Sequence, residues 1–305
     1  MPPDLSAGAP VFTAQRPVIG FLTDFGYDGA AAICRGVMLG IARDAQIVDI
    51  SHAVRKFAIA DGAYLLRAAI PWLPVGVHVA VVDPGVGTDR RPIAIRTVRG
   101  DVLIGPDNGL LLPAAERLGG IAEARLLANR AWMLPATSAT FHGRDIFSPI
   151  GAHLAIGEPF EDVGGAIDPG TLVRLDLPEP EALPGRLSTG VVYVDSFGNL
   201  RLAGGVVDLE AALGKVEPGT ALLVDYSAAR GGFNALVASE TGNAGSRRGD
   251  RWERLTWRRT FGEASPGDLL AYEDSSGNIA IAVSNGSATT RLGAGTGARI
   301  GIRRA

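Results

Sequence analysis

Short apolar runs alternate with helical patterns through the first half of the chain. The runs VIGFLTD (18–24), IVDI (47–50) and VHVAVVD (77–83) are rich in Val and Ile, as buried strands are. Between them, apolar residues recur with helical spacing over about 29–43 and 58–70. This alternation predicts a three-layer α/β domain, in which helices cover both faces of a mostly parallel sheet. The runs PIAIR and VLIGPD extend the sheet, and residues 143–157 predict a further helix.

The pattern changes after LDLPEPEALPG (175–185), where the density of proline predicts an exposed linker. Short strands without intervening helices follow, from GVVYVDSFGNLRL to ARIGIRR, and predict an all-β domain built as a small barrel. We therefore expect an α/β domain over 17–182 and a β-barrel domain over 186–305. A polar stretch rich in Gly, Ser and Arg predicts a loop insertion near 228–255, and residues 1–16 predict a disordered tail.

Composition and charge narrow the class of partner. The chain has 305 residues, of which 47% are hydrophobic and 20% charged, enough for two globular cores. Its 29 basic and 32 acidic residues are mixed along the sequence and leave a net charge of −3, so no basic field favours nucleic acid or an anionic membrane. No stretch reaches the ~18 apolar residues of a membrane span, and the start lacks the pattern of a signal peptide. We expect a cytoplasmic protein with a small-molecule partner.

Polar residues follow several of the predicted strands. Asp24 comes after VIGFLT, Asp83 after VHVAVV, and Asp107 and Asn108 after VLIGP. Ligands of open α/β sheets bind beyond the carboxyl ends of the strands, so these residues together predict the rim of a pocket. Taken singly, each is also a normal turn former or helix cap.

The segment TFHGRDIFSP places His142 just before a predicted helix. The helix dipole disfavours a cation there, which suits a neutral histidine, although a capping or core histidine explains the position as well. No metal site is predicted, because no recognisable ligand spacing is present and an arginine near Asp83 would compete for its charge. There is no Walker loop and no G-x-S-x-G elbow. Cys34 lies in the small-residue helical pattern AAAICRGVMLG, which predicts a buried structural thiol.

Two turns of the predicted barrel carry further polar groups. VDSFGNL offers Asp195 and Asn199, and EDSSGNIAIAVSNG offers Ser275, Ser276 and Ser284. From spacing alone both are plain hairpin turns. A carboxylate beside an amide can also hold an ammonium group and a purine edge.

The motifs LTDFG, VVDPGVGTDRR, TFHGRDIFSP and VDSFGNL, in this order, resemble the family of S-adenosyl-L-methionine (SAM) hydrolases, or SAM hydroxide adenosyltransferases. These are relatives of the SAM-dependent fluorinase and chlorinase. The resemblance implies hydrolysis of SAM to adenosine and L-methionine without a cofactor. It also implies a homotrimer with active sites where one subunit's first domain meets its neighbour's second.

By the same resemblance, the catalytic triad falls on Asp83, Arg90 and His142. Asp24 would bind the ribose and Asn199 the adenine, while Asp195 and Ser275, with Asp28, would hold the methionine end. The full set of expected substrate-binding residues is Asp24, Asp28, Asp107, Asn108, Phe141, Gly143, Asp195, Asn199, Ser275, Ser276 and Ser284.

The stretch FHG favours hydrolysis over halogenation, because the halogenating relatives carry tyrosine at the position of His142 and the fluorinase carries serine at that of Gly143. Arg201 departs from the pattern, since the chlorinase has an aromatic residue there. A chlorinase and a non-catalytic SAM or adenosine sensor remain alternatives. A glycosidase using Asp83 with Asp107 or Asp145 leaves Arg90 unexplained.

The chemistry of the triad can be anticipated from its residue types. A water held by Asp83, Arg90 and His142 would attack the ribose C5′, and a site shielded from bulk water favours this step because the sulfonium loses its charge. Pairing with arginine lowers a carboxylate pKa, so we expect Asp83 to orient the water as an acceptor. We expect Arg90 to stabilise developing hydroxide and neutral His142 to position or take the proton. The glycines of the Pro84–Gly87 turn would let Arg90 fold back beside Asp83.

Overall fold

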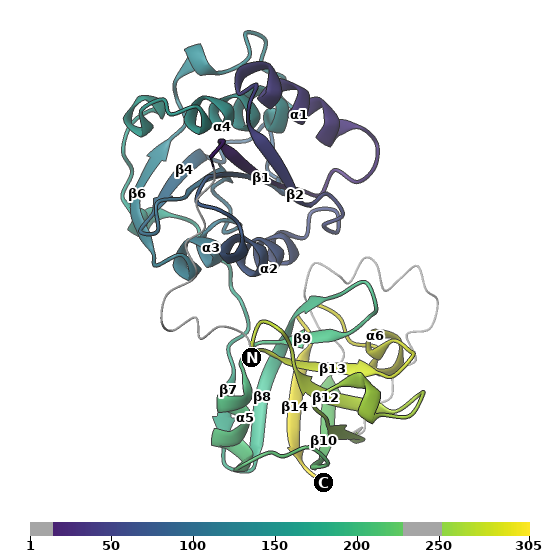
Figure 1. The fold of residues 1–305 in the computed structure, drawn as a ribbon. Coiled ribbons are helices and arrows are strands. Elements are labelled where there is room, and N and C mark those ends of the chain that lie inside the picture. The colour runs from purple at the N-terminus through teal and green to yellow at the C-terminus, as the bar shows by residue number, and fades with distance from the viewer. Residues whose placement is uncertain (1–14, 228–251) are drawn as a thin grey trace. The chain divides into compact units, whose positions relative to one another are not determined.

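The computed structural model describes residues 15–227 and 252–305. Within them the chain forms two compact units, one ending at Leu175 and the other beginning at Asp176 (Figure 1). This division lies inside the proline-rich segment 175–185. Most of the predicted tail, and residues 228–251 of the predicted insertion, fall outside the described residues.

The first unit is built on a six-stranded, mostly parallel sheet. Its strands have the order β2-β1-β3-β5-β4-β6, and β2, β1, β3 and β5 run parallel while β4 is antiparallel to both its neighbours. The strands are β1 (Val18–Thr23), β2 (Gln46–Ser51), β3 (Val77–Val81), β4 (Pro92–Thr97), β5 (Val102–Pro106) and β6 (Ile121–Leu126). The carboxyl ends of β1, β2 and β3 therefore meet at one edge of the sheet.

Helices cover both faces of this sheet, as the alternating pattern predicts (Figure 1). The helix α1 (Ala30–Ile41) packs on α4 (Ser148–Ala155) at one face, and α2 (Ile59–Ala69) packs on α3 (Leu112–Arg117) at the other. Neighbouring residues of β1 enter opposite cores, Phe21 with α1 and α4 and Leu22 with α2. Short 3₁₀ turns lie at Ile70–Trp72, Arg130–Trp132, Phe160–Val163 and Pro169–Thr171.

The helix predicted over 143–157 begins with a π-helical turn, Gly143–Phe147, that leads into α4. Pro149 has no N–H to donate to the Asp145 carbonyl, which accepts from the Leu134 N–H instead (3.0 Å). The Ser148 hydroxyl donates to the Gly143 carbonyl (2.7 Å). The wide turn holds the segment that follows His142, and such turns are frequent at functional sites.

The second unit is a closed seven-stranded β-barrel, which confirms the predicted architecture. The ring runs β14-β10-β11-β12-β13-β9-β8 and closes through pairing of β14 with β8, while β7 extends from β8. The strands are β7 (Glu181–Leu183), β8 (Arg186–Val194), β9 (Leu200–Leu202), β10 (Ala221–Ser227), β11 (Trp252–Trp257), β12 (Leu269–Glu273), β13 (Ile279–Val283) and β14 (Arg299–Arg304). Closure leaves the ring strands without a free edge.

Two expectations for this unit differ from the structure. The barrel contains helices, α5 (Val206–Leu213) and α6 (Ala288–Leu292), besides a 3₁₀ turn at Phe261–Glu263. The α5 helix buries Leu209 against the barrel, and the Asp208 carboxylate accepts from the Gly205 N–H at its start (2.8 Å). The end of the polar stretch is also no loop, because β11 occupies Trp252–Trp257 and turns Leu255 and Trp257 inward.

A buried ionic network lies between the central strands of the first unit. His78 on β3 and Asp101 beside β5 are both fully buried, and His78 Nε2 lies 3.0 Å from Asp101 Oδ1. Arg99 donates to the same carboxylate from Nε (2.6 Å) and Nη2 (2.9 Å). Burial raises the pKa of Asp101, but the bonds from His78 and Arg99 outweigh it and lower that pKa to about 2. Gly20 makes room for the imidazole on the neighbouring strand.

Gly20→Ala tests how tightly this network fills the space between β1 and β3. A Cβ on Gly20 would lie 2.4 Å from His78 Nδ1, so we expect a loss of about 2 kcal/mol in the free energy of unfolding, from overpacking. Gly40→Ala is the control, because a Cβ there meets open space on α1 and should stabilise by ~0.5–1 kcal/mol. Urea unfolding followed by circular dichroism measures both, and equal effects would contradict the prediction.

Candidate active site

Asp83, Arg90 and His142 lie together in the first unit. Arg90 Nε donates to Asp83 Oδ1 (3.1 Å) and Arg90 Nη2 donates to Asp83 Oδ2, so the pairing is bidentate. The same Nη2 lies 3.1 Å from His142 Nδ1. The Asp83 and Arg90 side chains are only 5% and 8% exposed. The three groups therefore form one continuous, largely water-shielded network.

Two turns bring these side chains together. Asp83 stands two residues beyond the end of β3, and the turn after it carries the chain back to Arg90, with the Val86 N–H donating to the Asp83 carbonyl (3.2 Å). Gly87 has a φ of +80°, and a Cβ there would lie 2.6 Å from the Ala139 carbonyl oxygen. Glycine is thus needed for contact with the segment before His142. A Cβ at Gly85 would make only ordinary contact with Arg90.

Burial dominates the electrostatics of the carboxylate. It raises the pKa of Asp83, and Arg90 and His142 offset this only in part. The expected lowering of the Asp83 pKa by arginine is therefore wrong, because desolvation of a carboxylate with a side chain 5% exposed outweighs the ion pair. Asp83 is consequently a stronger base than an exposed aspartate.

The surroundings of His142 favour its neutral form. Burial and then the Arg90 guanidinium lower the pKa of His142, and these outweigh the opposing effect of Asp83. The direction agrees with the expectation of a neutral histidine, although its leading causes are burial and Arg90. An arginine has no acceptor, so Nδ1 accepts from Arg90 and the imidazole proton lies on Nε2. In this tautomer His142 is a donor.

A cavity of about 220 Å³ opens beside Asp83 and His142. Asp24, buried at the end of β1, borders it, and its Oδ2 accepts from the Phe57 N–H (2.8 Å). The other oxygen, Oδ1, takes no hydrogen bond from any residue in the described parts of the chain, so it is free to accept from a ligand. In the described parts of the chain, the lining consists of Asp24, Phe25, Lys56, Phe57, Val81, Asp83, Val86, Thr140, Phe141, His142 and Gly143.

Gly143 is needed at this wall for steric reasons. A Cβ there would lie 2.9 Å from Phe25 Cζ, closer than carbon atoms approach. Phe25 in turn meets Phe141 edge to face, with ring centroids 5.8 Å apart. A larger residue at position 143, serine included, would displace this aromatic pair.

Six lining residues are not among those that the sequence predicts, namely Phe25, Lys56, Phe57, Val81, Val86 and Thr140. Phe25 and Thr140 lie inside motifs that were singled out for their polar neighbours. Lys56 and Phe57 follow β2, whose end offers no carboxylate, so the strand-end argument gave no signal there. The positive φ of Phe57 (64°) is visible only in the structure.

Three expected binding residues of the first unit do not line this cavity. Asp107 is engaged by Arg91, whose Nε donates to Oδ2 (2.8 Å), and by the Val173 N–H (2.9 Å). Asn108 donates to the Val82 carbonyl (2.9 Å) and accepts from the Leu110 N–H (3.2 Å). Their polar groups hold the chain after β5. Asp28 is exposed in the loop before α1.

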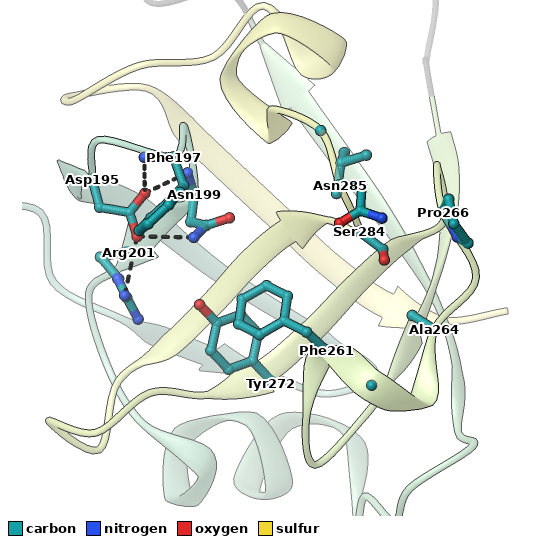
Figure 2. A pocket seen from close by; sticks show the side chains of 13 residues that line it. Asp195, Phe197, Asn199, Arg201, Phe261, Ala264, Pro266, Tyr272, Ser284 and Asn285 are labelled. Atoms are coloured by element: carbon teal, nitrogen blue, oxygen red, sulfur yellow. Dashed lines mark hydrogen bonds and ion pairs between the residues drawn. The ribbon is translucent and has the colours of Figure 1, made fainter.

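The barrel has a pocket of its own, of about 890 Å³, which contains Asp195, Asn199 and Ser284 of the expected residues (Figure 2). The Asp195 carboxylate accepts from the N–H groups of Phe197 (3.0 Å) and Asn199 (2.9 Å), from Asn199 Nδ2 (2.9 Å) and from Arg201 Nη2 (3.2 Å). The Asp195 carboxylate thus already accepts four hydrogen bonds from within the protein. Asn199 is thereby fixed with its amide oxygen available to accept.

Arg201 lies between two carboxylates and contacts both Asp195 and Asp274. Its Nη1 lies 3.0 Å from Asp274, and its guanidinium lies 5.8 Å from the centre of the Tyr272 ring. Tyr272 packs against Phe261 at the pocket wall (Figure 2). The pocket thus offers aromatic surface together with arginine. Ser275 and Ser276 are exposed in the β12–β13 turn and are not part of its lining.

Two negative findings hold for the described residues. Residues 15–227 and 252–305 contain no group of three or more His, Cys, Asp or Glu side chains placed to hold a metal ion. No helix in these same ranges has the length and apolar character needed to cross a membrane.

Known proteins are similar to this chain over most of its length. Residues 19–164 match the SAM hydroxide adenosyltransferase N-terminal domain, and residues 235–301 match the C-terminal domain of that family. A protein of Salinispora tropica named (R)-S-adenosyl-L-methionine hydrolase is 40% identical over 294 residues, 95% of this chain and 98% of its own. One of the same name from Thermus thermophilus is 36% identical over 92% of this chain and 96% of its own.

A fluorinase and a solved structure are also similar to this chain. A fluorinase of Actinoplanes sp. is 31% identical over 65% of this chain and 74% of its own. Among solved structures, an uncharacterized conserved protein from Thermotoga maritima has a TM-score of 0.79 and 32% identity, and the match covers 94% of this chain and 100% of that one.

The electrostatic contact between Arg90 and His142 can be measured directly. We expect His142 to titrate below the usual histidine pKa, and Arg90→Gln to raise its pKa by removing a cation and leaving the Asp83 charge unpaired. Imidazole NMR resolves this, because the chain has four histidines. Arg35→Gln, which removes an arginine paired with Asp49 instead, is the control and should leave His142 unchanged. An Arg90→Gln protein with unaltered His142 titration would contradict the assignment.

Proposed function

The chain belongs to the SAM hydroxide adenosyltransferase family, and from this membership we propose that it hydrolyses SAM to adenosine and L-methionine. The observation that carries the proposal is the network of Asp83, Arg90 and His142 beside the cavity that Asp24 borders. It unites an acceptor, a cation and a neutral donor, which are the groups that attack by water requires.

The proposed reaction is an in-line displacement at the ribose C5′. Water forms the new C5′–O bond while the C5′–S bond breaks, and its electron pair turns the sulfonium into the neutral thioether of methionine. A proton of the water passes to Asp83, whose raised pKa suits this role, and leaves to solvent after release of product. Charge is lost in the transition state, so a buried site favours it.

Each member of the triad has a distinct proposed role. Asp83 aligns the water and accepts its proton. Arg90 keeps Asp83 in place and has a buried Nη1 without a protein partner among the described residues, which gives it a donor for developing hydroxide. His142 donates from Nε2, because Arg90 occupies Nδ1. Alignment of this kind is worth several kcal/mol.

The groups for the rest of the substrate follow the same logic. Asp24 offers Oδ1 to the ribose hydroxyls, and the Phe57 N–H fixes its orientation. Asn199 is assigned to the adenine, which is supported by the amide oxygen that Asp195 leaves available. The occupied carboxylate of Asp195 makes it a positioning residue for Asn199 rather than a partner for an ammonium group. A homotrimer and a cytoplasmic location stay predictions.

Water is proposed as the nucleophile in preference to halide. Gly143 has no side-chain donor, and Phe25 leaves no room for the hydroxyl that the fluorinase carries at this position. Purified protein given SAM in chloride-free buffer should form adenosine and methionine, identified by mass spectrometry. Formation of 5′-chloro-5′-deoxyadenosine on addition of chloride would favour a chlorinase, and tight SAM binding without product would favour a sensor.

Asp83→Ala and His142→Ala should separate catalysis from binding. We expect kcat to fall by ~10²–10⁴-fold, as when acid–base groups are removed, with Kd for SAM within about threefold. Asp89→Ala is the matched control, because this exposed carboxylate lies in the same turn and should leave both values unchanged.

Asp24→Ala should give the opposite pattern, with Kd raised and kcat less affected, because its contacts with the ribose exist before reaction. Calorimetric titration and initial rates measure the two quantities. Equal losses of binding and turnover in the Asp83 and His142 variants would contradict the assigned roles.

A further inference from the structure

Lys56 stands at the rim of the catalytic cavity, although no motif pointed to it. It follows β2 and is exposed, and its Nζ donates to the Phe25 carbonyl (3.2 Å). It is one of only two lysines in the chain, whose other cationic side chains are arginines. The described residues give it no carboxylate partner within ion-pair distance. Its charge therefore borders the cavity without a carboxylate ion-paired to it from residues 15–227 or 252–305.

The backbone around Lys56 is held in place by the loop after β1. The Gly26 N–H donates to the His52 carbonyl (2.7 Å), and the Phe57 N–H donates to Asp24 (2.8 Å). Phe57 adopts a φ of +64°, which costs of order 1–3 kcal/mol for a residue with a Cβ. A strained, pinned backbone fixes where the Lys56 side chain begins. Strain of this kind is concentrated at ligand sites.

Charges around the cavity complement an amino-acid zwitterion. Among the described residues, Lys56 is the single Lys or Arg of the cavity lining, alongside the carboxylates of Asp24 and Asp83. Across Gly26 stands Asp28, and a Cβ on that glycine would lie 3.7 Å from Lys56 Nζ and 3.9 Å from Asp28 Oδ1. An ammonium and a carboxylate thus flank one small residue without forming an ion pair with each other. An α-amino acid head carries a carboxylate and an ammonium, the charges complementary to these two side chains.

We propose that Lys56 binds the α-carboxylate of SAM and selects for substrates that carry it. The inference rests on the proposed function, because it assumes that the methionine part leaves C5′ towards this rim. Arg90 is not the partner proposed for this carboxylate, since Asp83 engages its Nε and Nη2 and the remaining Nη1 is assigned to the developing hydroxide. A lysine suits a carboxylate at an open rim, because its ammonium is a compact point charge on a flexible stem. The α-ammonium then meets Asp28.

Substrates with and without the carboxylate test the proposal. The probe is S-adenosyl-3-(methylsulfanyl)propylamine, which is SAM lacking that group. We expect Lys56→Met to lower kcat/KM for SAM by about tenfold or more, mainly through KM, because a charge-assisted contact present before reaction is lost. The analogue should change less than twofold. Lys56→Arg should restore part of the preference for SAM, and Lys215→Met, the other lysine, is the matched control.

A second measurement needs no turnover. Amine acetylation followed by mass spectrometry reports the reactivity of Lys56 against Lys215 as an internal standard. SAM should protect Lys56, whereas the analogue without a carboxylate should not. Equal protection by SAM and the analogue would overturn the proposal, and so would an equal loss of kcat/KM for both substrates in Lys56→Met. Lys56 would then serve only to hydrogen-bond the Phe25 carbonyl. Absence of adenosine formation by the unaltered protein would instead refute the proposed function.

Discussion

The buried pairing of Asp83 with Arg90 is the constraint on which the site depends. Placing a carboxylate and a guanidinium out of water is costly unless each finds a well-oriented partner, and here the bidentate geometry supplies one. Arg90 also acts on His142, because its guanidinium donates to Nδ1 and, after burial, is the main cause of the lowered His142 pKa. Arg90 thereby limits the rise in the Asp83 pKa that burial causes, and it fixes the tautomer of the histidine.

The rest of the cavity is assembled from loops that follow parallel strands. β1 supplies Asp24, β2 is followed by Lys56 and Phe57, and β3 is followed by Asp83. Because these strands are neighbours and run parallel, loops separated by tens of residues in sequence meet at one edge. The tight turn at Gly87 then brings in the segment before the π-helical turn. Rigid strands thus hold flexible side chains where chemistry needs them.

Sequence reasoning anticipated the contact that lies within one contiguous motif. Asp83 and Arg90 are seven residues apart, so a single turn contains their contact, and the α/β and barrel patterns were legible from apolar periodicity. It was wrong for Asp107, whose surroundings depend on how the strands pair. Asp107 resembles Asp24 as a strand-end carboxylate, yet antiparallel β4 brings Arg91 beside it and engages it. Lys56 lies in none of the motifs that indicated the site. The pKa of Asp83 depends on burial, which only the folded chain reveals.

The seven-stranded ring has a consequence for the order of biosynthesis. Its closing strand is β14, which pairs with β8 more than a hundred residues earlier. The α/β sheet draws all its strands from residues 18–126, so it can be complete while the ribosome is still translating the second unit. The barrel can close only after residues 299–304 have left the exit tunnel. Until then β8 and β10 each have an unpaired edge, to which chaperones can bind.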